Sequence, residues 1–239
     1  VFSWAGNPGA GSLHAFRRAA EGKASAPLEL EEYSHFGMVA RFSAGAARLP
    51  FWPLHDYRGT DLPRANPQIR WVSCPFTGDE LAAVPALNPD VTFIHAQRAD
   101  AEGNTQIWGL VGVQKEAAFA SRRVIVAVEE LVDASVIRAD PNRTLIPGFI
   151  VDAVVVEPWG AHPSYAQGYY DRDNDFYLRW EPISRDPARL AAYLEEFVYA
   201  TPDRASYLVR HPGLTERLRA SQRVLITRQG LERRLQLLG

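Results

Sequence analysis

The chain has 239 residues, an apolar fraction of 46% and a formal net charge of −2. This length suffices for one large α/β domain or two small ones with a sizeable core, and the near-neutral charge gives no broad field that would attract nucleic acid or an acidic membrane surface. No apolar run approaches the roughly 20 residues needed to span a bilayer, which argues against a transmembrane helix.

The first expected element is a helix from about Gly11 to Glu21, because apolar residues recur there at helical spacing. The preceding Pro8-Gly9-Ala10-Gly11 resembles a glycine-rich loop that binds an anion at a helix N-terminus. No Lys-Ser or Lys-Thr pair follows, as it would in a P-loop, so a flexible turn with a cap is the favoured interpretation.

A strand is expected at about 28–33, followed by a helix over 36–49 that is rich in Gly and Ala. Small residues at helical spacing allow such a helix to lie close to a sheet or a neighbouring helix. Ser34 is a good N-cap for this helix. Ser34 and His35 therefore lie at a strand-to-helix junction. For Ser34 alone capping is the better interpretation, whereas for the pair capping and ligand binding are equally supported.

Residues 49–68 contain four prolines, and no regular element is expected in them. Two strands, at 69–74 and 81–87, lead to a nearly unbroken apolar run at 91–96, which predicts a central strand buried on both faces. Polar residues follow this strand directly. Ligands bind beyond the carboxyl ends of strands in open α/β sheets, so these residues are binding candidates: Gln97, Arg98, Asp100, Glu102 and Asn104.

Helices and strands alternate through the rest of the domain, which predicts one doubly wound α/β domain with an open, mostly parallel sheet flanked by helices. The expected elements are a helix at 113–121, a strand at 124–128, a helix at 132–137 and a strand at 149–156. Beyond Asp175 the pattern becomes helical. Residues 215–238 are rich in Arg and Leu and predict an amphipathic arm that packs on the domain or on a partner subunit.

The residues alone do not name a reaction. The histidines show no metal-ligand spacing, and there is no nucleophile elbow and no dinucleotide-binding fingerprint. His95, inside an apolar strand, is most simply a hydrogen-bonded core residue. His162 follows a Gly-Ala turn, where holding the loop is at least as well supported as catalysis. Three polar segments follow predicted strands: Ser34 and His35, residues 97–104, and the loop around His162. Together they predict a pocket lined with Ser, His, Arg, Asn and Tyr that suits a carboxylate, amide or phosphate.

Many short motifs over about residues 1–199 occur in the same order as in a known protein family. The clearest are Glu31-Glu-Tyr-Ser34, Ala47-Arg-Leu-Pro-Phe51, Cys74-Pro-Phe76, Ala83-Val-Pro85, Ile94-His-Ala-Gln97, Ile107-Trp-Gly109, Val151-Asp-Ala-Val-Val155, Gly160-Ala-His-Pro-Ser164 and Tyr170-Asp-Arg-Asp-Asn174. In these motifs the chain resembles the alpha (A) subunit of heteromeric class I coenzyme A transferases, of the glutaconate CoA-transferase type.

The resemblance implies a CoA-transferase-like α/β fold and exchange of coenzyme A between an acyl-CoA thioester and a free carboxylic acid. It implies that the nucleophilic glutamate belongs to an obligatory beta subunit, so no catalytic residue, metal or cofactor is expected in this chain, and the CoA thioester is a substrate. Ser34 and His35 are expected to hold the distal end of the acyl group. Gln97, Asn104 and His162 complete the predicted substrate-binding set.

Carboxylates of this chain, Glu31, Glu32, Glu102 and Glu129, are accordingly not expected to become acylated. The predicted domains are a CoA-transferase alpha-subunit domain at 1–200 and a helical C-terminal arm at 201–239. The family's N-terminal strand, which normally precedes this region, is expected to be missing. The single cysteine and the absence of a signal-peptide pattern fit a reducing, cytoplasmic location.

Two other functions remain open at this stage. Some relatives of the fold are hydrolases that open a ring on a CoA thioester, using an acidic residue just before a Gly-Met pair. Here Phe36 precedes Gly37-Met38, which argues against that role, although the neighbouring His35 could act as a base. The second alternative is a catalytically silent scaffold or metabolite-binding subunit, because fold alone does not fix function.

Overall fold

A computed structural model describes residues 1–6, 11–23 and 28–219 of the chain. Its larger sheet has five strands in the order β7-β5-β4-β6-β8. Strands β4, β6 and β8 are parallel to one another, whereas β5 pairs antiparallel with β4, and the edge strand β7 pairs antiparallel with β5. The strands are β4 Val91–Ala99, β5 Thr105–Gln106, β6 Arg123–Leu131, β7 Thr144–Ile146 and β8 Ala153–Val156. The expected α/β fold is confirmed, and the sheet is mixed.

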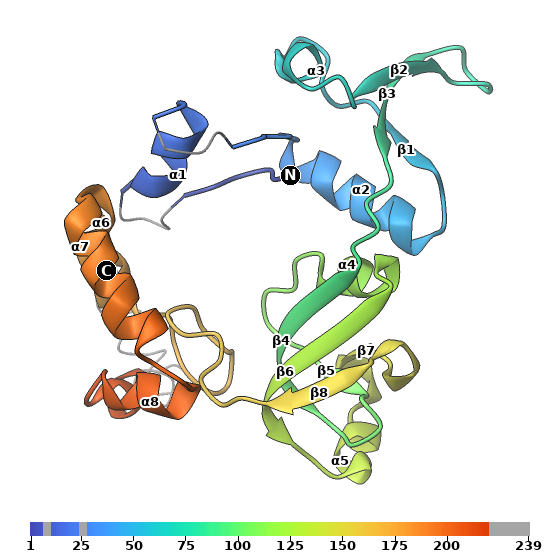
Figure 1. The fold of residues 1–239 in the computed structure, drawn as a ribbon. Coiled ribbons are helices and arrows are strands. Elements are labelled where there is room, and N and C mark those ends of the chain that lie inside the picture. Colours follow the sequence, from blue (N-terminus) through green and yellow to red (C-terminus); the bar gives the residue numbers. More distant parts are fainter. Residues whose placement is uncertain (7–10, 24–27, 220–239) are drawn as a thin grey trace, which may run out of the picture.

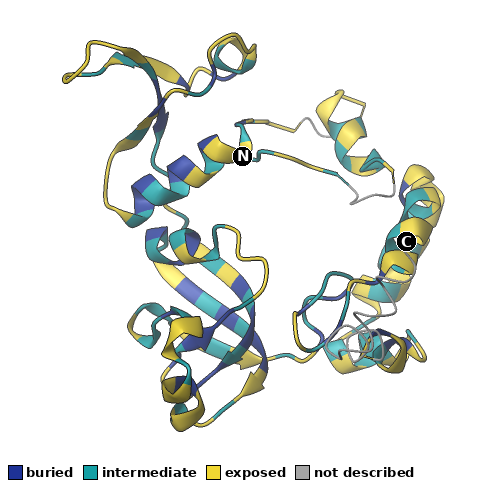
Figure 2. Cartoon of the chain, turned by 180° about the vertical axis from the view of Figure 1, so that it is seen from behind, coloured by how far each residue is buried: buried dark blue, intermediate teal, exposed yellow. Residues whose placement is uncertain are grey.

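One face of this sheet forms the main core, with α4 (Gln114–Ala120) packed near it. Ile94 and Ala96 of β4 and Val124, Val126 and Val128 of β6 are buried there. On the opposite face the first half of β4 is open, and Phe93 is 75% exposed. Figure 2 shows this alternation along the strands. The expectation that residues 91–96 are buried on both faces is therefore wrong for the first half of the strand.

A second, antiparallel sheet has the order β1-β3-β2, formed by β1 Phe51–Leu54, β2 Arg70–Ser73 and β3 Glu80–Pro85. The expectation of no regular structure at 49–68 is wrong, because β1 and the short helix α3 (Leu62–Ala65) lie there. The prolines fit these elements for simple reasons. Pro53 lies on an edge strand, and Pro63 lies in the first turn of α3, where a missing N–H costs little.

Helix α2 (His35–Ala46) packs against β1 and β3 of the second sheet and against α4 of the large sheet, and it confirms the helix expected after Ser34. Its small residues allow the expected close approach. A side chain at Gly45 would meet the backbone oxygen of Leu87 and the methyl group of Ala120. The strand expected at 28–33 is reduced to a single bridge between Phe2 and Glu32.

The C-terminal part is helical, as expected. It contains α6 Asn174–Arg185, α7 Pro187–Leu194, the π-helical turn η3 Glu195–Tyr199 and α8 Arg204–Val209. Figure 1 shows the elements following one another around a ring, with α1 (His14–Ala20) beside α6. His14 Nε2 lies 3.0 Å from Glu181 Oε1, which joins the two helices. Helix α1 itself confirms the first predicted helix.

The remaining described elements are short and lie in the segments that connect strands of the large sheet. They are α5 Ala134–Ala139 and the 3-10 turns η1 Pro141–Arg143 and η2 Gly148–Ile150. The turn η2 occupies the first residues of the strand expected at 149–156, so β8 starts later than predicted. In the described ranges no helix is both long and apolar enough to cross a membrane, and the cytoplasmic location stays a prediction.

The two-part domain division at residue 200 also stays a prediction. Most of the predicted arm, residues 220–239, lies outside the described residues, as does the turn 7–10. The described beginning of the arm packs on the body of the protein: Leu214 and Leu218 are buried against Trp159, Ala166 and Tyr170.

Candidate functional site

Gln97 lies within β4 and not beyond it, because the strand continues to Ala99. Its buried amide ties two segments to the sheet. Nε2 donates to the backbone oxygens of Trp108, at 2.9 Å, and Gln167, at 3.4 Å, and Oε1 accepts from Trp108 N at 3.4 Å. Gln97 therefore holds the walls of a cavity of about 170 Å³ that lies between β4, residues 107–114 and the loop 161–167.

His95 lies two residues earlier on the same face and lines the same cavity. Its Nε2 is 2.6 Å from Oε1 of Glu129 on β6. The buried Glu129 carboxylate also accepts from the Tyr170 hydroxyl at 2.6 Å and from Trp159 N at 2.8 Å. Because both other partners are donors, the shared hydrogen of the His95 contact belongs to His95 Nε2. Burial and the bond to Glu129 raise the pKa of Tyr170, so its hydroxyl stays protonated.

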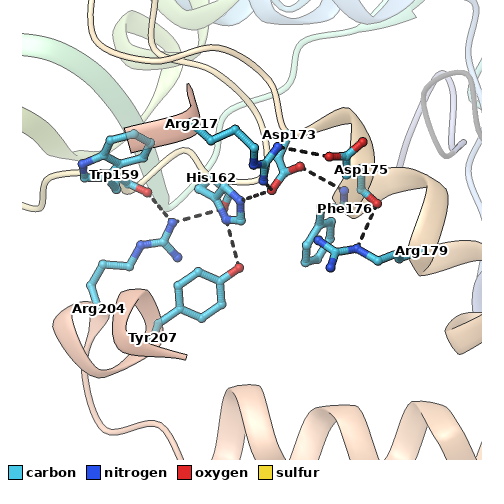
Figure 3. A network of polar contacts seen from close by, with 9 residues as sticks. All are labelled: Trp159, His162, Asp173, Asp175, Phe176, Arg179, Arg204, Tyr207 and Arg217. Atoms are coloured by element: carbon cyan, nitrogen blue, oxygen red, sulfur yellow. Dashed lines mark hydrogen bonds and ion pairs between the residues drawn. The ribbon is translucent and has the colours of Figure 1, made fainter. Parts of the chain in front are cut away.

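His162 belongs to a separate network, shown in Figure 3. Its ring is fully buried, with Nε2 3.1 Å from Asp173 Oδ2 and Nδ1 3.0 Å from the Tyr207 hydroxyl. Asp173 also accepts from Arg217 at 2.9 Å and from Phe176 N at 3.0 Å. Burial lowers the pKa of His162, although Asp173 opposes this shift. The network joins loop 157–173 to the C-terminal helices, which favours the loop-holding role over substrate contact.

Asn104 braces the turn between β4 and β5. Its Nδ2 donates to Asp100 Oδ2 at 2.9 Å, and its Oδ1 accepts from Gly148 N at 3.0 Å. Gly103 before it has a φ of 86°, a conformation that favours glycine. Both polar atoms of the Asn104 amide are thus used inside the protein, and its predicted contact with substrate stays a prediction.

Ser34 is the N-cap of α2, as the sequence indicates. Its Oγ accepts from Gly37 N at 2.9 Å and donates to Asp56 Oδ2 at 2.5 Å, while Ser34 N donates to the Tyr57 hydroxyl at 3.1 Å. His35 is the first residue of the helix and is exposed. The pair therefore combines a structural serine with an accessible imidazole.

Beside this junction, Glu31 is held by two partners. It accepts from the Tyr33 hydroxyl at 2.6 Å and from the buried Arg41 at 2.7 Å. The bond from Tyr33, with the charge of Arg41, lowers the pKa of Glu31 although partial burial opposes the shift. Burial and Glu31 in turn raise the pKa of Tyr33 to about 12. Glu31 is thus fixed as an anion that is already paired.

The structure does not bring the five predicted residues into one pocket. Gln97 shares its cavity with polar residues outside the predicted substrate-binding set: His95, Gln114, Ser164 and Gln167. Ser34 and His35 lie at the start of α2, Asn104 in the β4–β5 turn and His162 in the C-terminal network. Among residues 1–6, 11–23 and 28–219, no three His, Cys, Asp or Glu side chains are grouped so that they could hold a metal ion.

The chain was compared with known protein families, curated proteins and solved structures. The family model described as coenzyme A transferase matches residues 11–157. The chain belongs to the coenzyme A transferase family. It is 51% identical over 203 residues to the A-type subunit of a 3-oxoadipate CoA-transferase from Pseudomonas knackmussii, a match that covers 85% of this chain and 71% of the relative.

A second relative is the A-type subunit of the glutaconate CoA-transferase of Acidaminococcus fermentans, at 34% identity over 76% of this chain and 62% of the relative. The crystal structure of that glutaconate enzyme superposes with a TM-score of 0.78 and 32% identity, covering 85% of this chain and 68% of that one. The predicted membership of the CoA-transferases, as a subunit of the alpha type, is confirmed. The chain spans about two thirds of the length of these relatives.

Proposed function

We propose that this chain is the alpha subunit of a heteromeric CoA-transferase that moves coenzyme A between an acyl-CoA thioester and a free carboxylic acid, with 3-oxoadipate as the first acid to test. The observation that carries the proposal is the 51% identity over 85% of this chain to the corresponding subunit of a 3-oxoadipate CoA-transferase, against 34% for the glutaconate relative.

The nucleophilic glutamate is assigned to a beta subunit. In the reaction implied by the family, its carboxylate attacks the thioester carbon and releases CoA thiolate, which leaves an acyl-glutamyl anhydride. The thiolate then attacks the glutamyl carbonyl, releases the first acid and forms a glutamyl-CoA thioester. The incoming acid reverses these two steps with its own carboxylate. CoA and one acid are exchanged, and the glutamate is regenerated.

The environments of the carboxylates in this chain support the assignment of the nucleophile to the beta subunit. A nucleophile must come within roughly 3–3.5 Å of the carbon it attacks. Glu129 is buried and surrounded by three donors, and Glu31 is paired with Arg41 and Tyr33. Glu32 and Glu102 are exposed on loops without a described cation against them. None of these four carboxylates is both accessible and placed beside hydrogen-bond donors of the described residues that could stabilise an oxyanion.

The role of Ser34 and His35 in binding the acyl group can be tested by kinetics together with stability. We expect Ser34→Ala to lower the free energy of unfolding by about 1 kcal/mol, because it removes the N-cap. His35→Ala should leave stability unchanged, since the side chain is exposed. If both residues hold the acid, each variant should raise KM for it roughly tenfold to a hundredfold, as expected for losing a hydrogen bond to a charged group. An unchanged KM in His35→Ala would contradict this role.

The proposed function itself is tested by co-expressing the chain with a beta subunit of the same family. The complex should elute as one hetero-oligomer in light scattering and transfer CoA to 3-oxoadipate in preference to glutaconate. Full activity of this chain as a stable monomer would contradict the heteromer. Steady thioester hydrolysis without transfer to either acid would contradict the transferase and favour the hydrolase function.

A further inference from the structure

The second sheet, β1-β3-β2, has two faces of different exposure. In an antiparallel pair, residues directly opposite each other point to the same face of the sheet. Leu54 and Ala82 are such a pair, and they belong to the core that this sheet forms with α2, so they mark the inner face. Alternation along the strands places the intervening residues on the other side. The outer face includes Phe51, Pro53, Arg70, Val72, Leu81 and Ala83.

This outer face is open in the described structure, although its side chains are apolar with a single exception. Phe51 is 41% exposed. Pro53 is also exposed, and Val72 and Leu81 are half-buried. Figure 1 shows the sheet at the periphery of the molecule, beyond α2. An antiparallel sheet with one solvated face normally carries polar residues on that face. The composition of the outer face is therefore that of a surface covered by another protein segment.

Arg70 is the exception, and it defines the charge of the covering surface. It lies in the middle of the face, because Ala83 is opposite both Arg70 on β2 and Pro53 on β1. Among the described residues, no hydrogen-bond or ion-pair partner faces the Arg70 side chain. A purely apolar cover would bury this charge unpaired, which is strongly unfavourable. The covering surface must therefore combine apolar side chains with one carboxylate opposite Arg70.

Two candidate occupants fail this charge requirement. If the face packed on a second copy of itself, the two-fold contact would bring two Arg70 side chains into one interface without a carboxylate from either outer face. Residues 220–239 of the same chain contain four arginines and one glutamate, so they would add positive charge around Arg70. A different polypeptide that supplies a carboxylate is the better match.

We infer that the outer face of the second sheet is a docking surface for the beta subunit. The inference rests on the proposed function for the identity of this partner. The nucleophile of the beta subunit must reach the acid expected at Ser34 and His35. Strand β1 leads directly to that junction, since Asp56, two residues after its end, accepts from Ser34 Oγ at 2.5 Å. Arg58 also donates to the backbone oxygen of Glu80 at 2.5 Å, which ties the following loop to β3. A subunit that reaches this junction can continue across the outer face.

Charge reversal at Arg70 tests the inference. Arg70 is exposed and has no described partner, so Arg70→Glu should leave the isolated chain folded. The matched control is Arg64→Glu, because Arg64 is exposed on α3 and its described ion pair, with Asp61, is exposed as well. Sedimentation with a beta subunit of the same family should show at least about tenfold weaker association for Arg70→Glu, equivalent to about 1.4 kcal/mol, and wild-type association for the control. Equal association of all three proteins would overturn the inference.

A second measurement uses the wild-type protein and does not depend on a variant. The methyl resonances of Val72 and Leu81 should be broadened by a soluble paramagnetic probe in the isolated chain and protected from it in the complex. Val209, 80% exposed on α8, serves as the reference for an accessible methyl group in the isolated chain. Methyl groups of Val72 and Leu81 that stay accessible in the complex would overturn the inference. Protection by self-association of the isolated chain would assign the face to a second copy and overturn it as well.

The CoA-transfer assay separates this inference from the proposed function. Transfer by the complex together with unchanged association of Arg70→Glu refutes only the docking surface. Association that is lost in Arg70→Glu, in a wild-type complex that transfers no CoA, refutes only the transferase.

Discussion

Replacing Glu129 by alanine should lower the free energy of unfolding by about 3–5 kcal/mol. The change leaves the Tyr170 hydroxyl, Trp159 N–H and His95 Nε2 without their acceptor in a buried site. Each unsatisfied buried group costs about 1–3 kcal/mol. Urea denaturation measures the loss as a shift of the midpoint at constant slope.

The adjacent Glu130 provides the matched control. It is exposed, and in the described structure it accepts from the Tyr169 hydroxyl at the surface. Glu130→Ala should therefore change stability by less than about 1 kcal/mol. Glu129→Gln keeps one acceptor oxygen and should fall between the two. Equal effects of Glu129→Ala and Glu130→Ala would show that the buried carboxylate does not hold this part of the fold together.

The second large effect is expected at Asp173. Asp173→Ala should lower the free energy of unfolding by about 3 kcal/mol, which is the lower end of the range for removing one partner from a buried ion pair. The lower end applies because Arg217 keeps contact with solvent, while His162 remains fully buried. Asp175 is the control: its carboxylate is exposed and also faces Arg217, at 3.3 Å. Asp175→Ala should cost no more than about 1 kcal/mol.

The same carboxylate predicts a specific acid sensitivity. Burial opposes ionisation of Asp173, but hydrogen bonds from Arg217, His162 and Phe176 N outweigh it and lower its pKa to about 2. An unfolded aspartate titrates near pH 3.9. The stabilisation is therefore fully present above that pH and is lost as pH falls toward 2, because the unfolded chain binds the proton first. The Asp173→Asn variant should lose stability less steeply than the wild type over this range. Identical slopes would contradict the assignment.

Local signals in the sequence predicted the helices well. Ser34 before a run of small and apolar residues marked the start of α2, and the structure shows the capping bond from Gly37 N. Prolines were less informative, because their effect depends on position in the sheet. Pro53 is tolerated on the edge strand β1, and the sequence does not reveal which strand lies at an edge.

The candidate site depends on contacts that no local pattern contains. Position 95 meets position 129 because β4 and β6 pair in parallel register, with His95 opposite Ala127. Periodicity places His95 and Gln97 on one face of their strand, but it does not give the register of the partner strand. The roles of Glu129 and Tyr170 were missed for this reason.

The polar residues after β4 illustrate the same limit. The change from apolar to polar residues at Gln97 predicted the end of the strand, yet pairing with β6 and with β5 carries the strand on to Ala99. Backbone hydrogen bonding to neighbouring strands outweighed the side-chain pattern. As a result Gln97 is part of a wall, and Asn104 lies in the turn where its amide is used internally.

Trapping the covalent intermediate tests most directly whether the acylated carboxylate lies outside this chain. The assembled heteromer is incubated with its acyl-CoA and treated with borohydride, which reduces an enzyme-bound CoA thioester at the nucleophile to an alcohol, and the mass change is then located by peptide mapping. We expect the modified glutamate to belong to the beta subunit, with the present chain unmodified. Modification of Glu31, Glu32, Glu102 or Glu129 would contradict the division of labour between the two chains.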